Sequence, residues 1–275
     1  MTEARSGPEG GFALLIVLWS LALLALLGTR LMSSARTELQ LAGNISSSAV
    51  LEAQADGLVF DTVFQLLKDG PGTGGINGVD RVVAMPDGRG TVRVTSLAGK
   101  VNPNTASEPL MSALLRQIGL APEGAASLAA AIADWRTPGQ LPRPGGAKAP
   151  QYRAAGLPYL PPGAPFENID ELRQVLGMTP ALHAKLAPHM TVFYDGDPVW
   201  SIADPVVAGA LRATTGGNDG ALQESSDADG VYVQIDANVA RAVGQSFTRR
   251  AVAWAGHGAQ RGRYLVLSWD VAPLP

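Results

Sequence analysis

The chain has 275 residues, which is enough for one large domain or two smaller ones. Its composition is 46% hydrophobic and 16% charged, with 32 glycines and 20 prolines, and fits neither a coiled coil nor a disordered chain. A net charge of −3 argues against nucleic acid as a partner, and the absence of cysteine excludes disulfides, thiol catalysis and cysteine-bound zinc.

Residues 12–27 form an apolar run in which Ser20 is the one polar member. Extended to residue 32, this run would make a helix about 31 Å long, which crosses a bilayer core if Arg30 reaches back to the interface. The sequence therefore predicts a short polar leader over residues 1–11 and a transmembrane helix over residues 12–32.

Three interpretations of this N-terminus compete. Two of them are a cleaved secretory signal ending near Ser33-Ser34-Ala35 and a signal anchor that is not cleaved. We favour the third, because Gly11 closes the leader and Phe12 opens the apolar run, a boundary that resembles the leader of type IV pilins and pseudopilins. The resemblance implies that prepilin peptidase cuts between Gly11 and Phe12 and leaves the apolar helix attached to the mature protein.

The helix is expected to continue well beyond the membrane. Residues 33–67 contain no proline and two glycines, and their apolar residues recur at helical spacing. Lys68-Asp69-Gly70-Pro71-Gly72 is a stop signal, so the pattern predicts one helix of about 55 residues from Phe12.

Strands are expected on both sides of a helical middle region. Residues 80–85 and 90–97 predict a hairpin around Pro86-Asp87-Gly88. Near the other end, residues 198–213 predict a short helix, and three strands follow over residues 231–235, 246–254 and 263–271. The predicted fold class is α+β, in which the long helix packs on an antiparallel sheet and a helical domain is inserted between the sheet's parts.

The middle region, residues 99–192, carries the strongest family resemblance. Its apolar residues have helical periodicity on both sides of a loop that spans residues 137–165. The eight prolines of this loop indicate that it is stiff and ordered. The region's short sequence motifs, and their order and spacing, resemble those of the helix-hairpin-helix or SAM-like domain inserted in protein K, a minor pseudopilin of type II secretion systems. The pieces that carry the resemblance are Val101-Asn102-Pro103-Asn104-Thr105-Ala106-Ser107, Ala133-Asp134-Trp135-Arg136, Tyr152-Arg153, Gly156-Leu157-Pro158-Tyr159, Ala164-Pro165-Phe166, Glu171-Leu172-Arg173 and Gly177-Met178-Thr179-Pro180.

A second feature of the N-terminus resembles the same family. Most pilin-like subunits have a glutamate at the fifth mature position, which is Ile16 here. A carboxylate inside a bilayer is costly unless it is matched. Its absence resembles protein K and implies a subunit at the filament tip, with no neighbour above it.

The same middle region also supports a rival from another class of protein. A tethered helix-hairpin-helix module of a DNA-uptake system would hold phosphate on the backbone amides of a glycine-rich hairpin, supported by Lys and Arg. The best hairpin, Gly177-Met178-Thr179-Pro180, lacks a second glycine, and residues 100–192 hold eight Lys or Arg against six Asp or Glu. This composition does not favour DNA binding.

Catalytic motifs are missing from the sequence, so we do not expect an enzyme. The three histidines, His183, His189 and His257, have no metal-binding spacing and are predicted to face solvent, and Asp134 is predicted to brace its helix. The resemblance implies calcium held by carboxylates near the inserted domain, but Gly145-Gly146-Ala147-Lys148-Ala149 stands where relatives are usually acidic. Calcium therefore stays open, with alternative ligands at Asp195 and Asp197, or at Asp219, Asp227 and Asp229.

Taken together, the resemblance implies a non-enzymatic minor pseudopilin in the inner membrane, with its globular part in the periplasm. Its implied partners are minor pseudopilins I and J, major pseudopilin G and prepilin peptidase. The expected organisation is a leader over residues 1–11, a transmembrane helix over 12–32, the rest of the long helix with the hairpin over 33–98, the inserted domain over 99–192, and a short helix, polar loop and strands over 193–275.

Overall fold

The structure is a computed structural model. It describes residues 9–70, 76, 78–86, 88–216, 229–241 and 244–272, and in the first helix it describes the side chains of residues 14–27 and 41–69. The chain divides into two compact units, Met1–Ala53 and Gln54–Pro275.

The first unit contains most of one long helix. Helix α1 spans Glu9–Asp69, and its residues from Gln54 onward belong to the second unit. The predicted long helix is confirmed: it contains no proline, and its glycines at 43 and 57 do not interrupt it. It begins three residues before the predicted start and ends at Asp69, next to the predicted stop signal.

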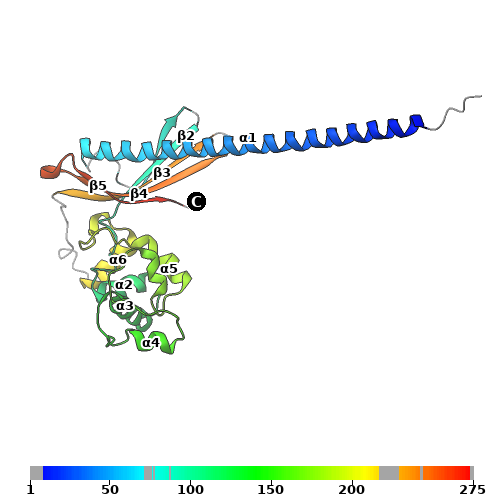
Figure 1. The fold of residues 1–275 in the computed structure, drawn as a ribbon. Coiled ribbons are helices and arrows are strands. Elements are labelled where there is room, and N and C mark those ends of the chain that lie inside the picture. Colours follow the sequence, from blue (N-terminus) through cyan, green and yellow to red (C-terminus); the bar gives the residue numbers. More distant parts are fainter. Residues whose placement is uncertain are drawn as a thin grey trace, which may run out of the picture. The chain divides into compact units, whose positions relative to one another are not determined.

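The second unit contains a five-stranded sheet. The last turns of α1 lie along this sheet (Figure 1). Leu58, Val59 and Val63 of this stretch are buried, as expected for the apolar face of a helix on a sheet. The helix approaches β2 so closely that a Cβ atom added to Gly90 would lie 2.8 Å from the Leu58 side chain. The predicted packing of the long helix on the sheet is therefore confirmed.

The sheet is antiparallel throughout, with its strands in the order β1-β2-β3-β4-β5. The strands are β1 Asp80–Met85, β2 Gly88–Ser96, β3 Gly230–Arg241, β4 Ser246–Gly256 and β5 Tyr264–Val271. The predicted hairpin is confirmed, with Asp80 opposite Arg93 and Met85 opposite Gly88. Because β2 and β3 are neighbours, everything between residues 97 and 229 enters and leaves the sheet at adjacent strand ends.

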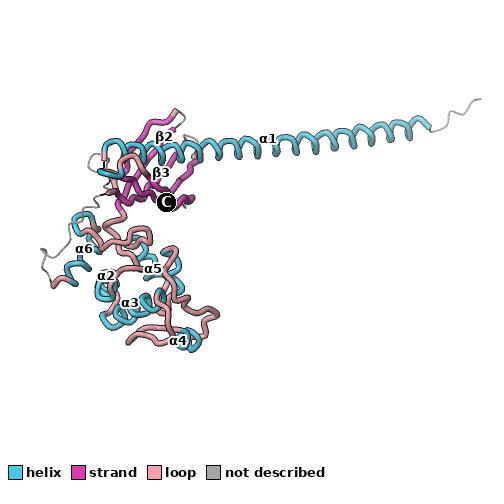
Figure 2. Tube along the Cα trace, turned by 60° about the vertical axis from the view of Figure 1, so that its left-hand side comes forward, coloured by secondary structure: helices cyan, strands magenta, loops and turns pink. Residues whose placement is uncertain are grey.

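The helices between β2 and β3 gather into a group apart from the sheet (Figures 1 and 2). They are α2 Glu108–Gln117, α3 Pro122–Arg136, α4 Ala149–Ala154, η1 Ile169–Gln174, α5 Pro180–Leu186, η2 Ala187–His189, η3 Trp200–Ile202 and α6 Pro205–Thr214. Leu114 and Ile132 are fully buried in their shared core. Val207 and Ala210 of α6 belong to the same core, beyond the boundary at residue 192 that the sequence suggested.

Among the helices, local structure departs from the sequence prediction in three places. The helix predicted over residues 198–213 is broken, because the Asp204 carboxylate caps the backbone amides of Val206 and Val207 and starts α6 afresh. Residues 169–174 form a 3₁₀ helix instead of an α-helix. The short helix α4 lies inside the proline-rich loop, where no helix was predicted.

Candidate functional site

The predicted processing residues lie in the first turns of α1. Gly11 and Phe12 are helical, but their side chains lie outside those that the structure describes. Cleavage between them therefore stays a prediction.

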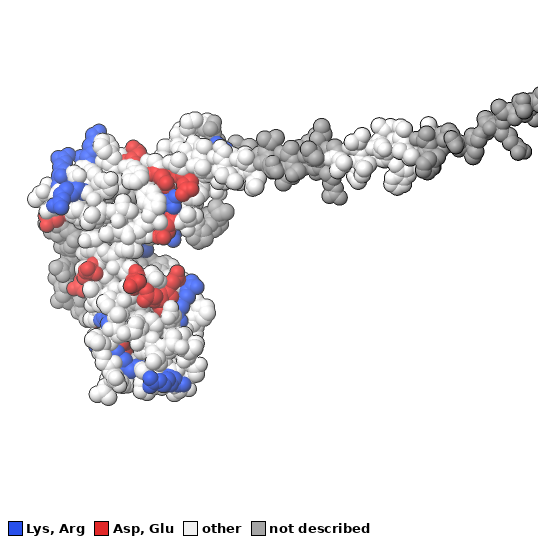
Figure 3. Space-filling model, in the orientation of Figure 1, with Lys and Arg blue, Asp and Glu red and all other residues white. Residues whose placement is uncertain are grey.

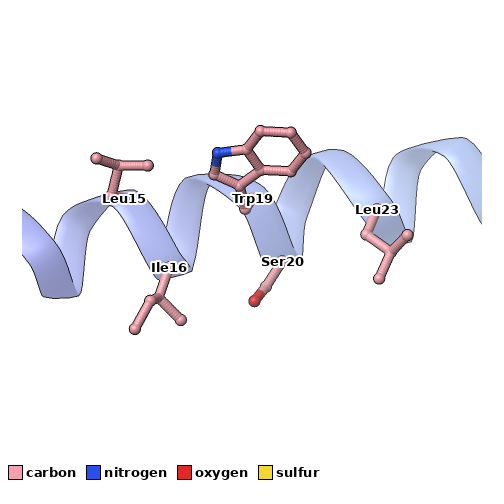
Figure 4. Close-up of a pocket in the computed structure, with 5 residues that line it drawn as sticks. All are labelled: Leu15, Ile16, Trp19, Ser20 and Leu23. Carbon is pink, nitrogen blue, oxygen red and sulfur yellow. The ribbon is translucent and has the colours of Figure 1, made fainter.

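Ile16 lies on an exposed, apolar stretch of α1. Every described side chain from residue 14 to residue 27 is exposed, including Ile16 at 52% and Trp19 at 72%. Figure 4 shows Leu15 and Trp19 on one side of the helix and Ile16 and Ser20 on another. An apolar surface of this extent calls for lipid or protein to cover it.

Across the described part of the chain, no helix combines the length and the apolar character needed to cross a membrane. The predicted span also includes residues 12, 13 and 28–32, whose side chains are not among those described.

Three charged residues close the proline-rich loop on the end of α3, and we call Asp134, Arg143 and Lys148 the loop clasp. The Asp134 carboxylate, 1% exposed, accepts hydrogen bonds from the Arg143 backbone amide at 3.0 Å and from its guanidinium at 2.9 Å. Lys148, 3% exposed, donates from Nζ to the backbone carbonyls of Asp134 and Thr137. Asp134 therefore braces its helix and loop, as predicted.

The loop clasp does not fit a calcium site. Calcium takes six to eight oxygen ligands, usually with several carboxylates. Here the one buried carboxylate is occupied by Arg143, and an ammonium group already holds the two carbonyls. Gly146 fills the remaining space, since a Cβ atom added there would lie 2.2 Å from Asp134 Oδ2.

Those of the alternative calcium ligands that the structure describes do not form a metal site. Asp195 and Asp197 are exposed, and Asp195 Oδ1 accepts from the Asn102 side chain at 3.0 Å. Asp219 and Asp227 lie outside the described residues, and Asp229 comes just before β3. In the residues that the structure describes, no group of three or more His, Asp or Glu side chains could hold a metal ion.

The prediction that the histidines face solvent is wrong for His183. This side chain is 4% exposed, with Nδ1 accepting from Arg173 Nε at 3.2 Å and Nε2 lying 3.3 Å from the Ile169 carbonyl. Those partners place it on the inward face of α5, so packing explains it and no catalytic role is needed. His189 is also largely covered and pairs with Asp204 at 2.8 Å.

The asparagine motif at the start of the helical region is structural. Asn102 is buried and donates to the Tyr194 carbonyl at 2.9 Å. The Asn104 side chain forms two hydrogen bonds with the Phe166 backbone, at 2.9 and 2.7 Å, much as a neighbouring strand would. The motif therefore joins three distant stretches of the chain, and its polar groups are used internally.

The hairpin that suggested DNA binding, residues 177–180, has few free hydrogen-bond donors for a phosphate. Thr179 Oγ1 already caps the Leu182 amide at 3.2 Å, and Pro180, at the first position of α5, has no N–H to donate. Over the face shown in Figure 3, the coloured basic and acidic side chains are mixed, without a broad area of either sign. A phosphate clamp relies on such an area.

Comparison with known proteins finds matches to type II secretion system protein K. A family model described as Type II secretion system (T2SS), protein K matches residues 91–195. The type II secretion system protein K of Aeromonas hydrophila is 29% identical over 208 residues, which cover 66% of this chain and 63% of that protein. The protein of the same name from Klebsiella pneumoniae is 33% identical over 86 residues, covering 31% of this chain and 26% of that protein. The match therefore spans less than two thirds of either relative's length.

A solved structure extends the likeness to the fold. A chain in the crystal structure of the GspK-GspI-GspJ complex of the enterotoxigenic Escherichia coli type 2 secretion system matches with a TM-score of 0.65 and 16% identity. The alignment covers 87% of this chain and 100% of that chain. At 16% identity this likeness is one of fold. The family resemblance predicted from the sequence is borne out over residues 91–195, which match the model of the protein K domain.

Proposed function

We propose that the chain is a minor pseudopilin of a type II secretion system, which caps or initiates the periplasmic pseudopilus and supports protein export across the outer membrane. The observation that carries the proposal is the protein K match over residues 91–195. The same chain has a long helix, α1, whose apolar side chains over residues 14–27 are exposed. The proposed role is assembly, without a catalysed reaction.

The proposed location is the inner membrane, with α1 as a single anchor and the second unit in the periplasm. The exposed side chains of residues 14–27 support this proposal, because lipid or other helices would cover them. Minor pseudopilins I and J are the proposed neighbours, as the name of the matched complex suggests. Major pseudopilin G would follow below them.

Ile16 is the residue proposed to set the position in the filament. A subunit with a neighbour above would need a carboxylate here to pair with that neighbour's terminal amine. An isoleucine removes the need for a match and the cost of an unmatched charge in the bilayer. We therefore place this subunit at the tip.

The experiment is the mature N-terminus of membrane-extracted protein, produced with and without prepilin peptidase. The proposal expects a chain that starts at Phe12 only when the peptidase is present. Gly11→Leu should block cleavage, because a large side chain would keep the extended leader from lying against the protease. Gly10→Leu is the matched control and should be cut.

Two outcomes would overturn the proposal. A start near Arg36 would mean an ordinary secreted protein, and a chain that is never cut would remove pilin-type processing. If cleavage is found, crosslinking to minor pseudopilins I and J from an Ile16→Cys variant that carries a thiol-linked photocrosslinker tests the proposed position, because the chain has no other cysteine.

A further inference from the structure

A cleft of about 750 Å³ lies within the second unit, between the sheet and the helical region. One wall comes from β2, β3 and β4, and the other from the segment between residues 168 and 193. The volume falls within the roughly 300–1,000 Å³ of typical ligand-binding sites. Nothing in the assembly role proposed above uses this cleft.

Three of the four Lys and Arg side chains that line the cleft are paired with a carboxylate. Arg93 pairs with Asp80 at 2.9 Å, and Arg173 pairs with Asp170 at 3.1 Å. Likewise Arg250 pairs with Asp236, at 2.6 Å. Each of these guanidinium groups therefore already has a carboxylate.

Lys100 is the cation that is left over. It lines the cleft and is half-buried, and no hydrogen bond or ion pair to its ammonium group is found among the described residues. Burial is the main cause that lowers the pKa of Lys100 and the nearby Arg250 lowers it further, whereas the charges of Asp236 and Asp204 act in the opposite direction. A half-buried ammonium group without a partner is unfavourable, and an incoming anion would relieve that cost.

The two walls differ in chemistry, which indicates the kind of molecule that carries the anion. The sheet wall is polar and includes Thr95 and Gln234 beside the paired charges. The opposite wall is mixed: Ala187, Pro188 and Met190 form an apolar part of it, and Asp170, Arg173 and His183 also line it. An extended peptide directs successive side chains to opposite sides, so it can present a carboxylate to one wall and apolar groups to the other.

We propose that this cleft binds an acidic segment of another protein chain, with the Lys100 ammonium group as the anchor for an Asp or Glu carboxylate. A free small anion would satisfy Lys100 but would leave the apolar part of the opposite wall, at Ala187, Pro188 and Met190, uncovered. The inference depends on the cleft and not on the leader, so it stands or falls separately from processing at Phe12.

The test uses the full chain in a neutral detergent and an array of acetylated, amidated pentapeptides. Each peptide has a central Glu flanked by Ala, Val, Leu, Ser or Gly, and each is placed beside its Gln counterpart. We expect a subset of Glu peptides to bind at least tenfold more tightly than their Gln counterparts. An array without any Glu-dependent binding would overturn the proposal.

The anchor itself is identified by lysine NMR on the strongest peptide. The chain contains four lysines, Lys68, Lys100, Lys148 and Lys185, so each signal of a ¹³C-lysine sample can be assigned by substitution. The Glu peptide should shift the Lys100 signal saturably and raise its pKa. Lys100→Met should weaken binding about tenfold or more, and the exposed control Lys185→Met should leave it unchanged.

Two results would contradict the anchor. One is equal binding by the Lys100→Met variant, measured on protein whose unfolding temperature matches that of the unsubstituted chain. The other is displacement of the peptide by sodium acetate at the peptide's own concentration, which would identify a simple anion site.

Discussion

Replacing Lys148 with methionine tests whether the loop clasp stabilises the helical region. Methionine keeps the length and bulk of the side chain but removes the donor that holds the Asp134 and Thr137 carbonyls. A hydrogen bond from a charged group contributes about 1.5–3 kcal/mol, and a buried acceptor left without a partner costs about 1–3 kcal/mol. Part of this loss is recovered because a charge no longer has to be desolvated.

We therefore expect Lys148→Met to lower the free energy of unfolding by about 2–3 kcal/mol. For a domain of this size, such a loss lowers the unfolding temperature by about 5–10 °C. The assay is thermal unfolding followed by circular dichroism, with exposed Lys185→Met as the control that should change little. A Lys148→Met protein that unfolds within a degree of the original chain would refute the reasoning.

The same thermal unfolding assay tests whether the chain binds calcium. Since Lys148 already occupies the carbonyls of the loop, adding calcium or a chelator should leave the unfolding temperature of the unsubstituted chain unchanged. A rise of several degrees with calcium would show that a site exists elsewhere in the chain.

Three further predictions concern other contacts of the second unit. Asp56→Asn should destabilise the chain by about 2–3 kcal/mol in chemical unfolding, because the buried Arg249 guanidinium loses the carboxylate 2.6 Å away; an effect smaller than that of Arg249→Met would contradict this. Asn104→Ala should cost about 2 kcal/mol in the same measurement, since two hydrogen bonds to the Phe166 backbone disappear, and an unchanged midpoint would argue against the motif's structural role. Gly146→Ala should lower the thermal midpoint, because the added methyl group would lie 2.2 Å from the clasp's carboxylate oxygen; full stability would mean that the loop moves freely.

Much of the fold was predictable because its signals are local. A proline-free stretch with helical periodicity predicted α1, and a Pro-Asp-Gly turn between alternating residues predicted the first hairpin. The end of β3 was missed, because Asp236 and Asn238 are poor strand formers. Their cross-strand partners compensate: Arg250 pairs with Asp236, and Thr248 accepts from Asn238 at 2.7 Å.

The interior polar contacts were less predictable than the helices and strands. Lysine is rarely buried, and the partners of Lys148 are backbone carbonyls more than ten residues away, which leave no trace in side-chain spacing. Buried His183 was missed for the same reason, since its partners come from η1. The unpaired charge of Lys100 could be recognised only once the pairs around it were known.

The adjacency of β2 and β3 also affects how the chain folds and how it can vary. The Leu97 amide donates to the Tyr232 carbonyl at 2.8 Å, so the two ends of the intervening segment meet at one point of the sheet. Doubling the length of a segment closed in this way costs only about 0.6 kcal/mol of additional chain entropy. Large insertions and deletions between these strands should therefore leave the sheet's stability nearly unchanged while slowing or speeding the pairing of β2 with β3.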